Sequence, residues 1–311
     1  MKGIRIVATG KALPKKSVSN EELSRIVETS DEWIVTRTGI HSRFQCEEES
    51  CLTLAVEAAR AAIESAGISK EEIGLILAAS TTSDYAFPST ACMVQQQLGI
   101  SEEVTAFDIS AACTGFLFGL GTARALLPQL PKRYALLIGA EQLSRIIDYT
   151  DRSTCILFGD GAGAVIVESA DHEFYQKSWS RGDVSALSCH GPGLGEQHIR
   201  MNGSEVFRFA VSAMEQGITE VLQDRNLTME DIDLVVCHQA NARIIGHVQR
   251  KFRGYEDKFF INIDSYANTS AASIPLALDD LNKAGRLKDG SRIICVGFGA
   301  GLTWSSALIE L

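Results

Sequence analysis

Short apolar runs recur along the whole chain, each bounded by glycine, proline or charged residues. Between them lie segments in which apolar residues recur with the period of a helix. Apolar runs of this length are typical of strands buried on both faces. The clearest are LILAAS (75–80), YALLIGA (134–140), LVVCHQ (234–239) and RIICVG (292–297). Buried strands that alternate with helices predict an α/β fold.

One pattern occurs twice. GISKEEI begins at Gly67 and leads into GLILAAS, and NLTMEDI begins at Asn226 and leads into DLVVCHQ. Each copy ends a helix at Gly or Asn, continues with a Ser/Thr-x-x-acid capping signal, and enters a buried strand. The segments VTAFDISAAC (104–113) and FFINIDSYAN (259–268) also correspond, since each has a short strand, an Asp and small residues. We therefore predict two duplicated α/β halves, residues 1–170 and 171–311.

Cys113 stands directly before TGFLFGLGTARALL (114–127), a segment that is apolar on all faces and predicts a buried helix. The positive end of the helix dipole and its free N–H groups favour a thiolate, which is the reactive form of a nucleophilic cysteine. A buried cysteine is more often an inert core residue. The position alone leaves both interpretations open.

His238 and Asn241 belong to HQAN, where a buried strand ends and a helix begins, and ligands bind at such strand ends in α/β sheets. Asn268 precedes small residues in YANTSAAS, which let a ligand or another backbone come close. A structural histidine and a helix-capping asparagine are the simpler alternatives.

Two glycine-rich segments allow more than one interpretation. Gly299, Ala300 and Gly301 follow a buried strand and can offer backbone N–H groups to an oxyanion, or they can form a simple turn. GDGAGA (159–164) resembles part of a dinucleotide fingerprint. It precedes the strand-like run AVIVES rather than a helix, so a tight connection into a strand is the better prediction.

The distribution of charge indicates which kind of partner the protein binds. The net charge of −10 argues against nucleic acid as a partner. Arg243, His247 and Arg250 nevertheless fall on one face of the helix after HQAN, next to Lys251, and this basic stripe predicts an acidic partner. The opposite face of that helix holds Ile244, Ile245, Val248 and Phe252.

Near the N-terminus, Trp33 and Arg37 form a possible clamp for an adenine ring and phosphates. A surface ion pair is the alternative role for the arginine.

Eight cysteines are scattered without C-x-x-C pairs, which favours reduced thiols and provides no zinc motif. The N-terminal residues lack the apolar core and cleavage site of a secretory signal. Every apolar run is far shorter than the roughly 20 residues of a membrane helix. We expect a cytoplasmic protein without a membrane span.

Three motifs in order, SAACTGF (110–116), HQAN (238–241) and ANTSAAS (267–273), resemble the β-ketoacyl-acyl-carrier-protein synthase III family. Members of this family initiate bacterial type II fatty acid synthesis. Four further segments resemble it: SDEWIVTRTGI (30–40), AFPSTA (86–91), DRSTCILFGDGAGA (151–164) and GFGAGLTW (297–304). The resemblance implies a thiolase-like α/β fold, in which two duplicated α-β-α-β-α halves form five layers.

It also implies a reaction. Cys113 would take an acyl group from acyl-coenzyme A, with acetyl-coenzyme A as the default primer. His238 and Asn268 would bind malonyl-acyl-carrier-protein and stabilise the enolate left by decarboxylation. Condensation would give a 3-ketoacyl-acyl-carrier-protein, CO2 and coenzyme A. The N–H groups of Cys113 and of the 299–301 loop would hold the oxyanion, and no cofactor would take part, since acyl-coenzyme A is a substrate.

The remaining implied roles concern binding. Trp33 and Arg152 would sandwich the adenine of coenzyme A, Arg37 would meet its phosphates, and Asn241 would line the pantetheine tunnel. Phe87 would reach into the acyl pocket of a second subunit, which implies a homodimer. Acyl carrier protein would dock on a set of residues around the basic stripe: Arg208, Gln239, Ala240, Asn241, Ala242, Arg243, Arg250 and Lys251.

One departure from the family is visible, because Ala267 stands where glycine usually precedes the active-site asparagine. Its methyl group would narrow the tunnel or shift the Asn268 backbone. Cys295 could imitate the second cysteine of a degradative thiolase, but it lies inside a buried run and is expected in the core.

Three alternative functions stay open at this stage. The first is a related ketosynthase of a specialised pathway, and the second is a non-catalytic protein that binds coenzyme A or acyl carrier protein. The third, a nicotinamide-dependent oxidoreductase, would require a glycine-rich turn directly after an early strand.

Overall fold

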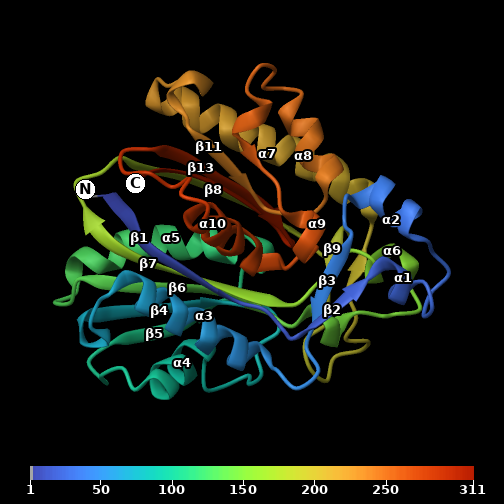
Figure 1. Ribbon diagram of the computed structural model, residues 1–311, viewed down its shortest axis with the longest axis horizontal. Helices are drawn as coiled ribbons and strands as arrows, with labels where there is room; N and C mark the ends of the chain where they lie inside the picture. The colour runs from blue at the N-terminus through green and yellow to red at the C-terminus, as the bar shows by residue number, and fades with distance from the viewer. Residues whose placement is uncertain (1–2) are drawn as a thin grey trace.

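The computed structural model describes residues 3–311, in which two five-stranded sheets form the frame (Figure 1). The first sheet has the order β5 (Thr105–Ile109), β4 (Ile73–Ala79), β6 (Tyr134–Glu141), β7 (Gly161–Ala170), β1 (Gly3–Ala12). The second has the order β12 (Phe259–Phe260), β11 (Leu234–Cys237), β13 (Arg292–Gly299), β14 (Gly301–Glu310), β8 (Phe174–Asp183).

The two sheets repeat one topology. In the first, β4 is parallel to β5 and β6, while β7 is antiparallel to β6 and β1. In the second, β11 is parallel to β12 and β13, while β14 is antiparallel to β13 and β8. Strand order and strand direction therefore match position by position, as the repeated sequence pattern predicts.

Helices fill three layers around the two sheets (Figure 1). Helices α5 (Gly115–Leu126) and α10 (Ser273–Lys283) lie between the sheets. Helices α3 (Cys51–Ala66) and α4 (Thr90–Leu98) cover the outer face of the first sheet, and α7 (Gly203–Arg225) and α8 (Ala242–Gln249) cover that of the second. The result is the predicted five-layer α/β architecture.

The remaining elements are short. Helices α1 (Asn20–Leu23), α2 (Asp31–Thr38), α6 (Arg152–Cys155) and α9 (Ile263–Tyr266) gather at one end of the layers, beside β2 (Lys16–Ser19) and β3 (Ser42–Gln45), at the right of Figure 1. Strands β9 (Leu187–Ser188) and β10 (Arg200–Met201) pair with each other. The 3-10 turns are η1 (Lys70–Glu72), η2 (Ala112–Thr114), η3 (Leu127–Gln129), η4 (Leu143–Ile146), η5 (Met229–Asp231), η6 (Glu256–Lys258) and η7 (Ser270–Ala272).

The repeated pattern at Gly67 and Asn226 forms the same local structure twice. Both residues adopt the left-handed conformation after α3 and α7, with φ of 63° and 54°. Ser69 with Glu72, and Thr228 with Asp231, then form reciprocal capping boxes that open η1 and η5. These two predictions from the sequence are confirmed.

Helix α5 carries much of the central core. Phe116, Leu117 and Leu120 are fully buried against both sheets, and burial of each such side chain contributes about 1.5–3 kcal/mol. The prediction that α5 is buried on all faces is too strong, because Thr122 is half-buried and Ala125 is exposed. Among residues 3–311, no helix is long and apolar enough to cross a membrane.

Candidate active site

Cys113 lies in η2, where the chain leaves β5 and turns into α5. Its side chain is buried, and the preceding Ala112 has a φ of 45°. Gly299, at the end of β13, packs directly on it. A Cβ atom on Gly299 would lie 2.9 Å from the Cys113 nitrogen, so only glycine allows this approach.

The environment of Cys113 disfavours the thiolate. Burial raises its pKa to about 12, while the Ser270 hydroxyl lowers it and the charge of Glu141 raises it. Burial therefore opposes the thiolate that the helix N-terminus is predicted to favour.

His238 follows β11 and is held by two contacts. Its N–H donates to the Val296 carbonyl at 2.8 Å, and its Nδ1 lies 2.6 Å from the Ser273 hydroxyl. That hydroxyl accepts from the Gln239 N–H, so its own proton can go to Nδ1 and the imidazole proton to Nε2. Nε2 has no partner in residues 3–311, and burial lowers the His238 pKa to about 3. A neutral histidine with a free Nε2–H is an oxyanion donor.

Asn268 is fixed by the segment before β7. Its N–H donates to Leu157 at 2.9 Å, and its carbonyl accepts from Gly159 at 3.0 Å. Its Oδ1 accepts from the Ser270 N–H at 2.9 Å, which leaves Nδ2 as the donor of the side chain.

Ala267, the departure from the family pattern, is buried and has a φ of 56° and a ψ of −158°. This conformation favours glycine. Ala267 does not line the pocket that contains Asn268, so its methyl group strains the backbone and does not narrow the pocket.

One pocket brings Cys113, His238 and Asn268 together, and Asn241 also lines it. The rest of its wall is mostly apolar: Leu157, Phe158, Leu187, Met201, Val206, Phe207, Ala240, Ile244 and Phe298, with Gly203. The loop at Gly299, Ala300 and Gly301 is not part of this wall but reaches the site through the contact of Gly299 with Cys113.

The Trp33 ring lies close to two guanidinium groups. Arg37 is 4.6 Å from the ring centre and Arg152 is 4.7 Å from it. The Asn241 side chain donates to the Arg37 carbonyl at 3.1 Å, which ties the start of α8 to α2. This group therefore connects to the pocket wall through Asn241.

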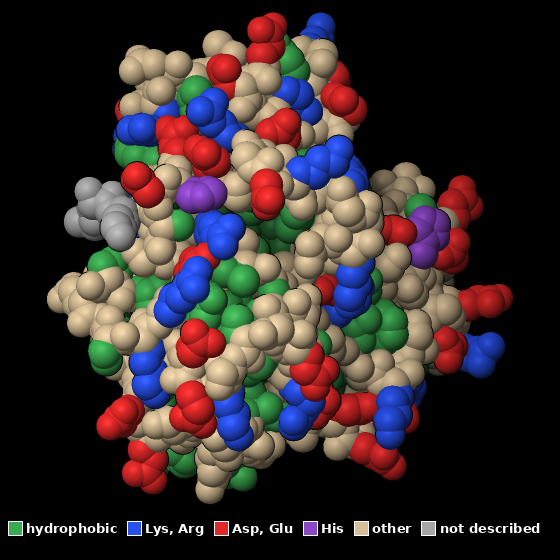
Figure 2. Space-filling view, turned by 60° about the vertical axis from the view of Figure 1, so that its left-hand side comes forward, with side chains coloured by type: hydrophobic (Ala, Val, Ile, Leu, Met, Phe, Trp, Pro, Cys, Tyr) green, Lys and Arg blue, Asp and Glu red, His purple; other side chains and the backbone are tan. Residues whose placement is uncertain are grey.

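Most of the basic stripe is exposed, since only His247 among its residues on and after α8 is half-buried. Arg243 lies 5.7 Å from the Phe207 ring centre, and Phe207 lines the pocket. Arg208, Arg250 and Lys251 are also exposed, and Lys251 pairs with Glu215 on α7. By contrast, acidic and basic side chains are mixed on the face drawn in Figure 2.

Two residues of the predicted docking set are buried. Gln239 is 1% exposed and its side-chain amide donates to the Cys237 and Phe260 carbonyls. Ala240 is buried in the pocket wall. Neither can meet a partner at the surface, whereas Asn241 and Ala242 are half-buried.

The structure also places three other features that the sequence analysis discussed: Phe87, Cys295 and the GDGAGA segment. Phe87 is 86% exposed on the loop between β4 and α4. Cys295 is fully buried in β13, as expected of a core residue, and burial raises its pKa to about 12. Strand β7 begins inside GDGAGA at Gly161, so the prediction of a tight connection into a strand is confirmed.

Sequence reasoning missed three polar residues beside the site. Ser273 orients His238, and Ser270 contacts Asn268 and Glu141. The one available signal was Glu141 itself, an acidic residue directly after the apolar run YALLIGA. No group of metal-ligating side chains is found in residues 3–311.

The duplicated five-layer fold, with Cys113, His238 and Asn268 at one pocket, defines a thiolase-fold protein. The family profile "3-Oxoacyl-[acyl-carrier-protein (ACP)] synthase III" matches residues 107–181, and its C-terminal profile matches residues 222–311. A β-ketoacyl-[acyl-carrier-protein] synthase III of Clostridium acetobutylicum is 45% identical over all of this chain and 99% of its own length. One from Rhizorhabdus wittichii is 46% identical over 98% of each chain.

The crystal structure of 3-oxoacyl-[acyl-carrier-protein] synthase III from Aquifex aeolicus superimposes with a TM-score of 0.95 at 43% identity, covering 99% of this chain and 100% of that one. The chain belongs to the 3-oxoacyl-[acyl-carrier-protein] synthase III family.

Proposed function

We propose that this protein condenses an acyl-coenzyme A primer with malonyl-acyl-carrier-protein and so initiates fatty acid synthesis. The products are a 3-ketoacyl-acyl-carrier-protein, CO2 and coenzyme A. One observation carries the proposal: a buried cysteine shares an apolar pocket with two side chains, His238 and Asn268, whose free donors are fixed by their neighbours. The protein is an acyltransferase, as its family membership also indicates.

In the first half-reaction, the Cys113 sulfur attacks the acyl carbonyl and coenzyme A leaves. The oxyanion that forms requires donors at its own position. The Cys113 N–H and an N–H of the 299–301 loop supply them, and the close packing of Gly299 on Cys113 supports this assignment.

In the second half-reaction, malonyl thioester loses CO2 and leaves an enolate. The Nε2–H of His238 and the Nδ2 amide of Asn268 stabilise the enolate oxygen in a pocket with few other polar groups. The enolate carbon then attacks acyl-Cys113. A His238 that stays neutral suits this role, because it donates a hydrogen bond without bringing a titrating charge.

Coenzyme A binds across Trp33, Arg37 and Arg152, with its pantetheine arm passing Asn241 into the pocket. The guanidinium groups beside the indole and the link from Asn241 to Arg37 support this path. Adenine can take the place of a guanidinium on the indole face, and the displaced cation can meet phosphate.

Acyl carrier protein, an acidic partner, docks on the exposed basic residues Arg208, Arg243, Arg250 and Lys251, beside the half-buried Asn241 and Ala242. The exposed Phe87 reaches the acyl pocket of a second copy in a homodimer. Residues 1–170 supply the nucleophile and residues 171–311 supply His238 and Asn268. The reaction takes place in the cytoplasm and uses no cofactor.

The test is intact-protein mass spectrometry after incubation with straight and branched short acyl-coenzyme A thioesters, followed by peptide mapping. We expect an acyl mass increment on Cys113 that is absent from Cys113→Ala. Comparison across the panel identifies the preferred primer. Folded protein that gains no increment from any thioester would overturn the assignment of Cys113 as nucleophile for coenzyme A esters.

A further inference from the structure

Glu141, the last residue of β6, is a completely buried carboxylate next to the active site. Among residues 3–311 it forms no ion pair with a basic side chain; only hydrogen-bond donors surround it. The Thr81 N–H, the Thr82 hydroxyl and the Ser270 hydroxyl all reach its oxygens, at 3.2, 2.5 and 3.0 Å. A buried carboxylate held only by donors has an acceptor role, and nothing in the condensation described above uses it.

Ser270 connects this carboxylate to the nucleophile. Its φ of 49° is unusual for a serine, and its N–H donates a hydrogen bond to the Asn268 Oδ1. Its hydroxyl donates to Glu141 at 3.0 Å, and η7, which begins at Ser270, packs against η2, which carries Cys113. A hydroxyl has one proton to donate and lone pairs that accept. A relay would therefore use the Ser270 oxygen to accept the Cys113 proton and the Ser270 O–H to donate to Glu141.

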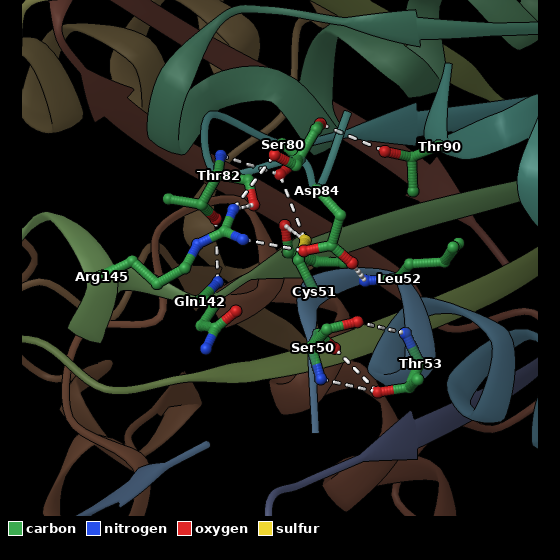
Figure 3. Close-up of polar contacts among 12 residues, drawn as sticks. Ser50, Cys51, Leu52, Thr53, Ser80, Thr82, Asp84, Thr90, Gln142 and Arg145 are labelled. Atoms are coloured by element: carbon green, nitrogen blue, oxygen red, sulfur yellow. Dashed lines mark hydrogen bonds and ion pairs between the residues drawn. The ribbon is translucent and has the colours of Figure 1, made fainter. Parts of the chain in front are cut away.

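The donors that hold Glu141 are themselves braced (Figure 3). Arg145 pairs with Asp84 at 2.8 Å and donates to the Ser83 carbonyl at 3.0 Å. The Thr82 hydroxyl accepts from the Gln142 N–H at 2.8 Å, so its proton is directed at Glu141. The 80–84 turn is thus built to keep the carboxylate in place.

The proposed acyl transfer requires a base, since the Cys113 thiol has a pKa of about 12 and His238 has one of about 3. A histidine with so low a pKa accepts a proton poorly. Burial raises the pKa of Glu141 above its ordinary value, which makes it a stronger base than an exposed carboxylate.

We propose that Glu141, acting through the Ser270 hydroxyl, accepts the Cys113 proton during acyl transfer and returns it when Cys113 is released. This rests on the proposed function. In the first half-reaction, the Cys113 S–H bond breaks, a C–S bond forms, Glu141 becomes protonated, and coenzyme A leaves as a thiolate that takes a proton from water. In the second, the enolate displaces the Cys113 thiolate, and Glu141 reprotonates it through Ser270. One proton from water is consumed per turnover, which balances the release of CO2 from a carboxylate.

The experiment measures the rate of Cys113 acylation by rapid quench and mass spectrometry in Glu141→Gln. We expect acylation about 100-fold slower than in the wild type, the lower end of the effect of a positioned base. Glu168→Gln is the matched control, because Glu168 is a buried carboxylate of β7 that is held by Arg5 and Arg133 away from the pocket. It should acylate at the wild-type rate.

A purely electrostatic role of Glu141 predicts the opposite change in the acylation rate. If Glu141 acts only through its negative charge, which raises the pKa of Cys113, its removal must favour the thiolate and accelerate acylation. Unchanged or faster acylation in Glu141→Gln therefore overturns the proposal. The pH profile separates the two further. Wild-type acylation should be nearly level at neutral pH, while the variant should gain about tenfold per pH unit as the free thiol ionises.

Ser270→Ala provides a second route if Glu141→Gln folds poorly. It should be slowed to a similar extent, and the double variant should lose no more than either single one, because both residues serve one path. Decarboxylation of malonyl thioester, which does not require Cys113 to lose a proton, should persist in both and reports an intact pocket. A wild-type protein that is not acylated would refute the proposed function, whereas a wild-type protein acylated no faster than Ser270→Ala would refute the relay alone.

Discussion

Single residues around the pocket hold backbone conformations that ordinarily favour glycine. Ala112, Ala267 and Ser270 have φ values of 45°, 56° and 49°. Each stands one or two residues from a side chain that faces the pocket or the relay. Positive φ at residues with a Cβ is a form of strain of order 1–3 kcal/mol, and it persists only where the surroundings fix it. Such strain positions Cys113 and Asn268 at the expense of stability.

The strain at Ala267 can be removed. Ala267→Gly should stabilise the protein by about 1 kcal/mol, because the relieved strain exceeds the roughly 0.5–1 kcal/mol of chain entropy that a glycine loses on folding. Urea unfolding of both proteins measures the difference. Ala284→Gly is the control, since Ala284 has an ordinary φ of −80° at the end of α10 and should be destabilised. If the free energy of unfolding changed in the same direction in both variants, the backbone at Ala267 would not be strained.

His238 makes stability depend on pH in a direction that its pKa fixes. In the folded protein this pKa is about 3, below the ordinary value of 6.5. Between pH 3 and 6.5, the unfolded chain therefore binds a proton at His238 and the folded chain does not. Unfolding is then favoured as pH falls, by about 1.4 kcal/mol per pH unit below pH 6.5.

The measurement is the free energy of unfolding of wild type and His238→Asn at pH 7, 6, 5 and 4. Carboxylates contribute equally to both proteins, so the difference between the two curves isolates His238. The wild type should lose stability faster than the variant below pH 6.5. Parallel curves would mean that His238 binds a proton as readily in the folded protein as in the unfolded chain.

At the scale of helices and strands, the sequence predicted well wherever the cause is local. The Gly67 and Asn226 helix ends and the capping boxes that follow them depend on residues within one turn. The helix α8 also agrees with its pattern, since Ile244, Ile245 and Val248 are buried and Arg243 is exposed. The burial of Gln239 and Ala240 has no signal in HQAN, because it depends on how distant segments pack around them.

The basic stripe of α8 yields a prediction at this scale. Charge reversal in the Arg243→Glu, Arg250→Glu double variant should raise KM for malonyl-acyl-carrier-protein about tenfold, since exposed interface charges are worth about 0.5–1 kcal/mol each. The effect should weaken with added salt. Acylation of Cys113 by acyl-coenzyme A should change little.

A matched charge reversal, Arg60→Glu with Lys288→Glu, controls for net charge, because Arg60 is exposed on α3 over the first sheet and Lys288 is exposed in the loop between α10 and β13. Steady-state kinetics against carrier protein at several salt concentrations provide the comparison. An equal rise of KM in both double variants would assign the effect to overall charge rather than to docking on α8.

At the scale of the whole molecule, the duplicated topology was predictable because each half repeats its own local signals. The pocket was predictable only in part. Sequence motifs identify Cys113, His238 and Asn268. The residues that surround them come from distant segments, since Glu141 lies 129 residues from Ser270 along the chain. Burial, which raises the pKa of Cys113 and lowers that of His238, is a property of the assembled layers and has no signal in a linear pattern.

Those layers meet through glycines. Gly139 of β6 lies against η7 of the other half, where an added Cβ would stand 2.2 Å from the Ala271 carbonyl oxygen. Gly163 of β7 similarly faces the backbone of α10, with the Leu276 nitrogen 2.8 Å from its would-be Cβ. Since η7 begins at Ser270, the contact at Gly139 fixes both the junction of the halves and the position of the relay.

Gly139→Ala should therefore affect stability and catalysis together. Backbone atoms cannot move aside as a flexible side chain can, so we expect a loss of about 3 kcal/mol, the upper end for overpacking, and a slower acylation of Cys113. Gly182→Ala in β8 is the control, because a Cβ there meets nothing within 4 Å. Thermal unfolding and the acylation rate are measured on both. If Gly139→Ala matched the control in both, the two halves would have to separate easily at η7, and neither Ser270 nor Asn268 could be held in place by the packing of the layers.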